Sequence, residues 1–247
     1  MYKVNILNPN CVYFAKLSKM KKLLDSLTTA DIHPLLGVNL NTENCVLLDF
    51  TAKNEELATL DITSTEVFNE YIYRQLEAPN KRFGVGGYLE PRAIYHRSEV
   101  FGKEDQERRS LHLGVDIWTD AGHPIYAPLA GRVHSFQDNE GFGNYGPTII
   151  LAHQHKELTF YSLYGHLTKT DLKGLKVGQT IHQGQEFAHI GPFPENGDWP
   201  PHLHFQLIKN LENHWGDYPG VCAPKDLDYY QNNCPNPELL LGMRGIL

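Results

Sequence analysis

Histidine is the residue type whose number and placement suggest chemistry in this sequence. The 247-residue chain contains 13 histidines, and ten of them lie between His112 and His204, about twice as many as an even distribution would place there. A neutral imidazole binds divalent metals, and its ordinary pKa lets it exchange protons near neutral pH. We therefore expect any catalytic or metal-binding site to lie in this stretch.

The pair in His202-Leu203-His204 is the first candidate. Side chains alternate between the two faces of a strand, so His202 and His204 would point to one side, about 7 Å apart, and Leu203 to the other. Both could bind one metal, or one could bind while the other contacts the metal-bound water. A histidine pair of this kind also occurs in purely structural settings, so the pair alone does not define a site.

A second candidate lies in the segment Leu111–Trp118. As a strand, it would place His112, Gly114 and Asp116 on one face and the aliphatic Leu113, Val115 and Ile117 on the other. The glycine between the two polar residues leaves room for an ion or a substrate. A helix would also put His112 and Asp116 on one face, but glycine and β-branched residues make a helix the weaker reading.

Short β-prone runs must position these residues. Between residues 109 and 208 such runs alternate with Gly, Pro and Asn turns at intervals of roughly ten residues, the spacing of an antiparallel sandwich or barrel-like sheet. The runs are Pro124–Ala127, Arg132–Phe136, Thr148–Leu151, Leu158–Leu163, Gln179–Ile181 and His202–Leu207.

The flanks of this region differ from it. Residues 1–108 form a mixed α/β region, with helices predicted at Val12–Leu27 and Thr63–Leu76 and a strand at Cys45–Phe50. Ser64 or Thr65 would cap the second helix. The glycine-dense segment Phe83–Tyr88 lacks the spacing of a nucleotide loop and indicates a turn or close packing. Residues 209–247 indicate an irregular tail with a short helix near Pro237 to Met243.

Three motifs follow one another along residues 109–208. They are HLGVD at His112–Asp116, YGHL at Tyr164–Leu167 and HLHF at His202–Phe205. In this order they resemble the lysostaphin-type, or LytM-type, zinc metallopeptidases (the M23-like peptidases), which cut cell-wall peptide crosslinks. The resemblance covers residues 109–207 and implies a divergent branch. It also implies an α+β fold whose core is an antiparallel β-sheet groove with the metal at its floor.

The resemblance assigns roles to individual residues. His112, Asp116 and His204 match the zinc ligands, one Zn²⁺ per chain, and a water would take the fourth position. His166 and His202 match the catalytic histidines that face the water and the oxyanion. Asn144 and Tyr145 are candidates for lining the cleft and binding substrate. The bulky Trp199-Pro200-Pro201 departs from the family's small, glycine-rich approach to the HLHF motif, places bulk at one groove wall and leaves the choice of substrate open.

The resemblance implies an endopeptidase acting on peptidoglycan-type peptides, and two alternatives stay open. The flanks resemble those of larger fusions with kinase-like and aminotransferase-like modules, which favours an intracellular zinc hydrolase of a non-wall peptide or amino-acid conjugate. A catalytically silent binding module is the other. Residues 1–108 could also cover the groove and supply a fourth ligand, with Glu90, His96 or an asparagine as candidates.

Composition narrows the possible partners and compartments. The net charge of -7 argues against binding to nucleic acid. The sequence contains no run of about 18 apolar residues, so we expect no membrane-spanning segment. Asn5, Asn8 and Asn10 interrupt any apolar signal core, so the chain as given is expected to be cytoplasmic, or periplasmic or extracellular if a signal was removed. Reduced thiols are therefore favoured for the four cysteines, Cys11, Cys45, Cys222 and Cys234.

We expect most histidines outside the three motifs to have structural rather than catalytic roles. His134, His182 and His189 are expected in packing or at the surface, and His153 and His155 in a solvated turn. His123 lies in an entry turn that could face the groove.

Overall fold

A single eight-stranded sheet dominates the computed structural model, which describes residues 31–77, 81–102 and 107–243. The predicted helix at Val12–Leu27 and Cys11 lie outside these residues. The strand order is β1-β2-β4-β11-β8-β7-β6-β9. The strands are β1 (Cys45–Leu48), β2 (Phe83–Gly86), β4 (Val115–Trp118), β6 (Gly131–Asn139), β7 (Gly146–His155), β8 (Leu158–Gly165), β9 (Thr180–Ile181) and β11 (His202–Ile208).

The strands from β4 to β9 are antiparallel to their neighbours, which confirms the predicted α+β class with an antiparallel core. Alternate side chains fill two apolar clusters. Val115, Ile117 and Leu203 belong to the larger cluster, whereas Ile150 and Leu163 belong to another. The sheet that carries the candidate residues is therefore packed on both faces.

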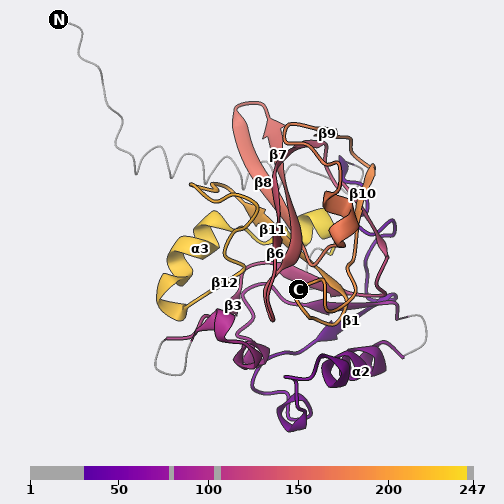
Figure 1. The fold of residues 1–247 in the computed structure, drawn as a ribbon, viewed down its shortest axis with the longest axis vertical. Coiled ribbons are helices and arrows are strands. Elements are labelled where there is room, and N and C mark those ends of the chain that lie inside the picture. Colours follow the sequence, from indigo (N-terminus) through magenta and orange to yellow (C-terminus); the bar gives the residue numbers. More distant parts are fainter. Residues whose placement is uncertain (1–30, 78–80, 103–106, 244–247) are drawn as a thin grey trace, which may run out of the picture.

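The N-terminal flank adds two strands to this same sheet. Strand β1, helix α2 (Thr65–Leu76) and strand β2 form a unit in which β1 and β2 are parallel, as expected when a helix connects neighbouring strands. Ser64 caps α2 by accepting a hydrogen bond from the backbone N–H of Val67, as predicted. Figure 1 shows α2 beside β1, at the end of the molecule away from the β7–β8 hairpin.

The glycine-dense segment is a buried strand, so the prediction of a turn was wrong and that of close packing was right. All four residues of β2 are buried. A Cβ at Gly84 would lie 2.6 Å from Leu48 Cδ1 on the neighbouring strand, so the glycine allows the Leu48 side chain to pack closely against β2. Little in the sequence indicates a strand here, because glycines interrupt the alternation of polar and apolar side chains by which a strand is recognised.

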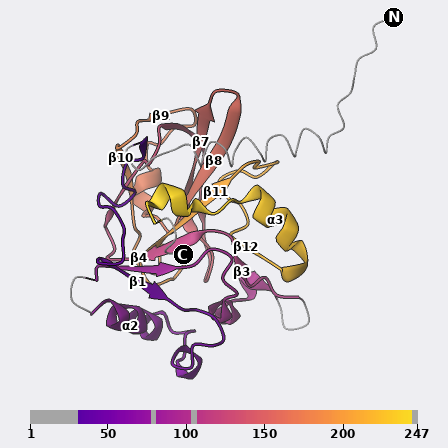
Figure 2. The ribbon, with the colours of Figure 1, turned by 180° about the vertical axis from the view of Figure 1, so that it is seen from behind.

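Two small sheets and several short helices complete the fold. Strand β3 (Leu111–His112) pairs with β12 (Val221–Cys222), and β5 (Pro124–Tyr126) pairs with β10 (Glu186–His189). The short helix predicted near Pro237 is η7 (Pro237–Leu241), but α3 (Leu227–Asn233) was not predicted. Figure 2 shows α3 beside β12 and β3. The other short helices are η2 (Leu57–Thr59), η3 (Ala93–Arg97), η4 (Glu99–Phe101), η5 (Lys169–Leu172) and η6 (Pro224–Asp226).

Two local predictions need correction. The segment Leu111–Trp118 is interrupted at Leu113 and Gly114, so Leu113 packs in a different apolar cluster from Val115 and Ile117. Strand β7 continues through His155, and His153 is 3% exposed, so His153 does not lie in a solvated turn. Its Nδ1 hydrogen-bonds the carbonyl of Ala130, and its Nε2 pairs with the hydroxyl of Ser162.

Within the described residues, Cys45, Cys222 and Cys234 are buried free thiols. No helix in that part of the chain has the length and apolar character needed to cross a bilayer.

Candidate metal centre

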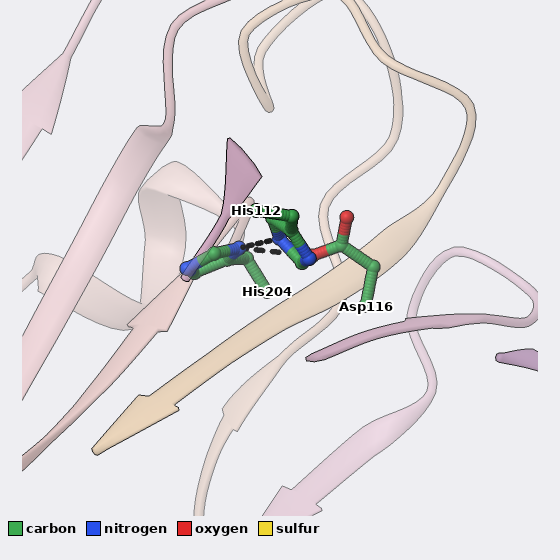
Figure 3. A group of neighbouring side chains, drawn as sticks. All are labelled: His112, Asp116 and His204. Atoms are coloured by element: carbon green, nitrogen blue, oxygen red, sulfur yellow. Dashed lines mark hydrogen bonds and ion pairs between the residues drawn. The ribbon is translucent and has the colours of Figure 1, made fainter. Parts of the chain in front are cut away.

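Three neighbouring strands bring His112, Asp116 and His204 together. Asp116 on β4 lies directly opposite His204 on antiparallel β11, and His112 comes from β3, which is held by β12. Figure 3 shows the three side chains converging. His112 Nε2 lies 3.0 Å from His204 Nδ1, and Asp116 Oδ1 lies 3.2 Å from the former and 2.9 Å from the latter.

Hydrogen bonds select which nitrogen each imidazole turns toward the cluster. The Nδ1–H of His112 donates to the carbonyl of Gly87 over 3.1 Å, which leaves Nε2 with its lone pair. The Nε2–H of His204 donates to Oε1 of Gln206 over 2.9 Å, which leaves Nδ1. The amide of Gln206 is itself oriented, because its Nε2 donates to the carbonyl of Pro219. Such partners hold metal-binding histidines in the correct tautomer.

The geometry and chemistry of these three groups fit a zinc ion. Two imidazole nitrogens and one carboxylate oxygen are typical of catalytic zinc sites, which keep a further position open. With bonds of about 2.0–2.1 Å, the ligand atoms of a tetrahedral zinc lie about 3.3 Å apart. The three separations here, from 2.9 to 3.2 Å, are close to that value. Among the described residues these three form the cluster that could hold a metal ion.

The protonation states also suit metal binding. Burial, together with the charge of Arg92, lowers the pKa of His112 to about 3. Burial alone would raise the pKa of Asp116, but His112 and Arg92 outweigh it and hold that pKa well below its usual range. His112 is therefore neutral and Asp116 ionised near neutral pH, the forms that bind metals.

Gly114 serves a different purpose from the one predicted. A Cβ there would lie 2.8 Å from Cε1 of His204 and 2.7 Å from the carbonyl oxygen of Phe205. The glycine thus makes room for the His204 imidazole and the neighbouring strand, rather than for an ion or a substrate.

Arg92, in the N-terminal flank, reaches the same cluster and was missed by the sequence analysis. The Nη1 of this buried arginine pairs with Oδ2 of Asp116, the oxygen on the far side from the two imidazoles, and its Nε pairs with Glu90 over 2.8 Å. Gly86 provides the space, because a Cβ there would lie 2.5 Å from Nη2 of Arg92. An isolated arginine outside the motifs carries no signal that separates it from a surface residue.

Glu90 and His96, the two named candidates for a fourth ligand, do not join the cluster. Oε1 of Glu90 accepts a hydrogen bond from the backbone N–H of Phe50, and Oε2 pairs with Arg92. His96 is exposed on η3. The flank therefore places an arginine beside the carboxylate of Asp116.

His166 and His202 form a second pair next to the first. Their ring centroids are 4.1 Å apart, and His202 Nε2 lies 4.0 Å from Asp116 Oδ2. Nδ1 of His166 donates to the carbonyl of Asn196, and Nδ1 of His202 donates to that of Pro200, each over 2.7 Å. In both rings Nε2 is therefore the nitrogen left to accept a proton. Burial lowers the pKa of His202 to about 4 and that of His166 well below its usual value.

A pocket with a volume of about 260 Å³ connects all five residues. Tyr145 and Asn144 line it, and the hydroxyl of Tyr145 lies 3.3 Å from His204 Nε2. Trp199 also lines the pocket, with its ring centroid 6.2 Å from that of His166. His123 does not line it: its Nε2 contacts the carbonyl of Leu36.

Comparison with known proteins confirms the predicted family. Residues 110–214 match the model of peptidase family M23. Over this segment, which is less than half of the chain, the sequence is similar to peptidase family M23.

Among curated relatives, the L-Ala–D-Glu endopeptidase of Bacillus subtilis is 29% identical over 129 residues, which cover 49% of this chain and 37% of the relative. The peptidoglycan DD-endopeptidase ShyC of Vibrio cholerae is 29% identical over 99 residues, which cover 40% of this chain and 20% of the relative. The chain thus matches well under half the length of these relatives. A solved structure of LytU is 26% identical and has a TM-score of 0.35, covering 53% of this chain and 86% of that one.

Proposed function

We propose that this chain is a zinc-dependent peptidase that hydrolyses peptide bonds in peptides of the peptidoglycan type. The observation that carries the proposal is the meeting of His112, Asp116 and His204 with ligand-atom separations of 2.9 to 3.2 Å, within a segment of the M23 family. The relatives named as peptidoglycan endopeptidases support the choice of substrate. We also propose that the peptidase domain comprises residues 109–208, with one flank before it and one after it.

Each group has a role that follows from its surroundings. His112, Asp116 and His204 would hold the zinc ion, which when bound supplies a Lewis acid and lowers the pKa of water. Nε2 of His166 and Nε2 of His202 can take a proton from the attacking water and return one to the leaving amine. The protonated imidazoles would also stabilise the oxyanion. Asn144 and Tyr145 line the pocket and would bind substrate.

The test combines metal analysis with digestion of muropeptides. We expect about one zinc per chain and release of new amino termini. His204→Ala should lose both the metal and the activity, whereas His202→Ala should keep the metal and lose the activity. A chain that takes up no zinc would contradict the metal site. A zinc-loaded chain that is inert toward a broad peptide panel would favour the binding module.

Hydrolysis of a non-wall peptide is the second candidate. It is favoured by the burial of all five site residues, whose side chains a polymer would have to reach through a small pocket.

A further inference from the structure

We propose that the pocket takes a short peptide with free ends, about two or three residues long, and excludes a polymer. This inference rests on the proposed peptidase function and specifies its substrate. It follows from how the two flanks enclose the site, and from two charged side chains in the pocket lining.

The five site residues are nearly fully buried at the bottom of the pocket. His112, Asp116, His166, His202 and His204 are each 5% exposed or less. A polymer bound across a groove needs an open path on both sides of the reacting bond, so the source of this cover determines what can enter.

The first wall is the segment Ala93–Phe101, which precedes the family-matched part of the chain. It crosses to the loop between β6 and β7, where the hydroxyl of Ser98 donates to the carbonyl of Phe142 over 2.8 Å. The contact is tight, because a Cβ at Gly143 would lie 2.6 Å from Cβ of Ser98. This segment therefore connects the N-terminal flank to the far side of the pocket.

Aromatic packing holds this wall in place. The rings of Tyr95 and Phe101 lie 4.3 Å apart, and that of Phe101 lies 6.2 Å from the ring of Trp199. The guanidinium of Arg97 lies over Trp199 and Phe142 at 4.6 and 4.7 Å. These contacts identify the segment as a fixed wall.

The second wall is the segment His214–Val221, at the end of the matched region and beyond it. Gly220 lies so close to the site that a Cβ would fall 1.8 Å from the hydroxyl of Tyr145 and 3.2 Å from Cε1 of His204. The carbonyl of Gly220 also accepts a hydrogen bond from the backbone of Leu113. The tail is thus packed directly onto the ligand residues.

The space between these walls suits a short substrate. A sphere of 260 Å³ is about 8 Å across, and an extended peptide advances about 3.3–3.6 Å per residue, so about two or three residues fit. The volume is close to the lower end of the range typical of small-molecule pockets.

The pocket lining also carries a charge of each sign beside the walls: Arg109, which lies outside both walls, and Asp217 in the second wall. Nη2 of Arg109 donates to the carbonyl of Val100, and neither Arg109 nor Asp217 forms an ion pair with another described residue. A free peptide is a zwitterion, and its carboxylate and ammonium groups complement these two side chains. Free ends therefore distinguish the substrate from an internal stretch of a longer chain.

The experiment compares four substrates with the zinc-loaded full chain. They are a library of free tripeptides, the same library with N-acetyl ends, the library with both ends blocked, and purified peptidoglycan. Mass spectrometry measures the products. We expect the free tripeptides to be cleaved at least tenfold faster than the doubly blocked ones, with no product from peptidoglycan.

Matched variants test the walls and the charges. Asp217→Asn should raise KM for free tripeptides about tenfold and leave that for N-acetyl tripeptides unchanged, whereas Asp228→Asn on α3 should change neither. Val100→Ala, at the pocket rim, should increase cleavage of doubly blocked peptides. Val38→Ala is its control, because both valines are 40% exposed and Val38 does not line the pocket.

The outcomes separate this inference from the proposed function. Cleavage of peptidoglycan or blocked peptides at rates similar to those of free tripeptides would overturn the inference and leave the peptidase function standing. Polymer cleavage that begins only after limited proteolysis of the Ala93–Phe101 segment would show an inhibitory cover and also overturn it. A zinc-loaded chain that cleaves none of the four substrates would contradict the function itself.

Discussion

Replacement of Arg92 by methionine probes how the N-terminal flank supports the metal ligands. The guanidinium lies between two carboxylates, and the exposed fractions of the side chains are 1% for Arg92, 5% for Asp116 and 12% for Glu90. Methionine has a similar length and can pack among the rings of Phe50 and Trp118, whose centroids lie 5.3 and 5.7 Å from the guanidinium. The change therefore removes mainly the charge and its hydrogen bonds.

The expected loss of stability follows from the buried charges that remain. Removing one partner of a buried ion pair costs about 3–5 kcal/mol, because the other charge is left uncompensated. In a domain of 150–250 residues each kcal/mol lowers Tm by about 2–4 °C, so the metal-free Arg92→Met variant should melt roughly 6–20 °C lower. Bound zinc would balance the Asp116 charge, so the difference should shrink in the loaded chain.

Scanning calorimetry with and without a chelator measures both differences. The double variant Glu90→Gln with Arg92→Met is the control, and it should recover part of the loss because one of the two stranded carboxylates is gone. The activity of the single variant should fall about 10–100-fold, the usual effect of losing a partner of a metal ligand. A metal-free Tm within about 2 °C of the parent, or an equal loss with and without zinc, would refute the reasoning.

Three further predictions concern other supports of the site and the core. Gln206→Leu should weaken zinc affinity about 10–100-fold in a chelator competition, because His204 loses the acceptor that holds its tautomer. Gly220→Ala should lower kcat/KM while the circular dichroism spectrum stays native, because the new Cβ displaces Tyr145; unchanged kinetics would contradict the contact. Burial lowers the pKa of His153 to about 4. The fold therefore loses stability as pH falls from about 6.5 to about 4, by up to about 3 kcal/mol. His153→Gln should flatten this part of a denaturation–pH profile, and an unchanged slope would refute the assignment.

Strand alternation explains why the centre of the site could be predicted. The spacing of His202 and His204 needs only the two-residue period of a strand, and the motif order supplied the pairing with His112 and Asp116. The register that sets Asp116 opposite His204 is a property of the assembled sheet. This register sets the distances between the side chains of Asp116 and His204, and neither the HLGVD motif nor the HLHF motif encodes it.

Contacts between distant, irregular segments explain what could not be predicted. Arg92 is an extended residue just before η3, and the wall Ala93–Phe101 consists mostly of two short 3-10 helices without a periodic pattern. Both reach the site only through the tertiary fold. The two-residue strand β12 pairs with β3 across more than 100 residues of sequence, and neither strand is long enough to show alternation. His153 was misplaced because polar residues at the end of β7 resemble a turn.

The position of β2 has a consequence for isolating the family-matched part of the chain. Strand β2 covers β4 along Gly84–Gly86, opposite Trp118–Asp116. A fragment of residues 110–214 would turn β4 into a bare edge with unsatisfied N–H and C=O groups, which is a template for self-association. The strand that carries Asp116 would then fray or aggregate, so excision at the homology boundary should give insoluble protein even with every motif intact.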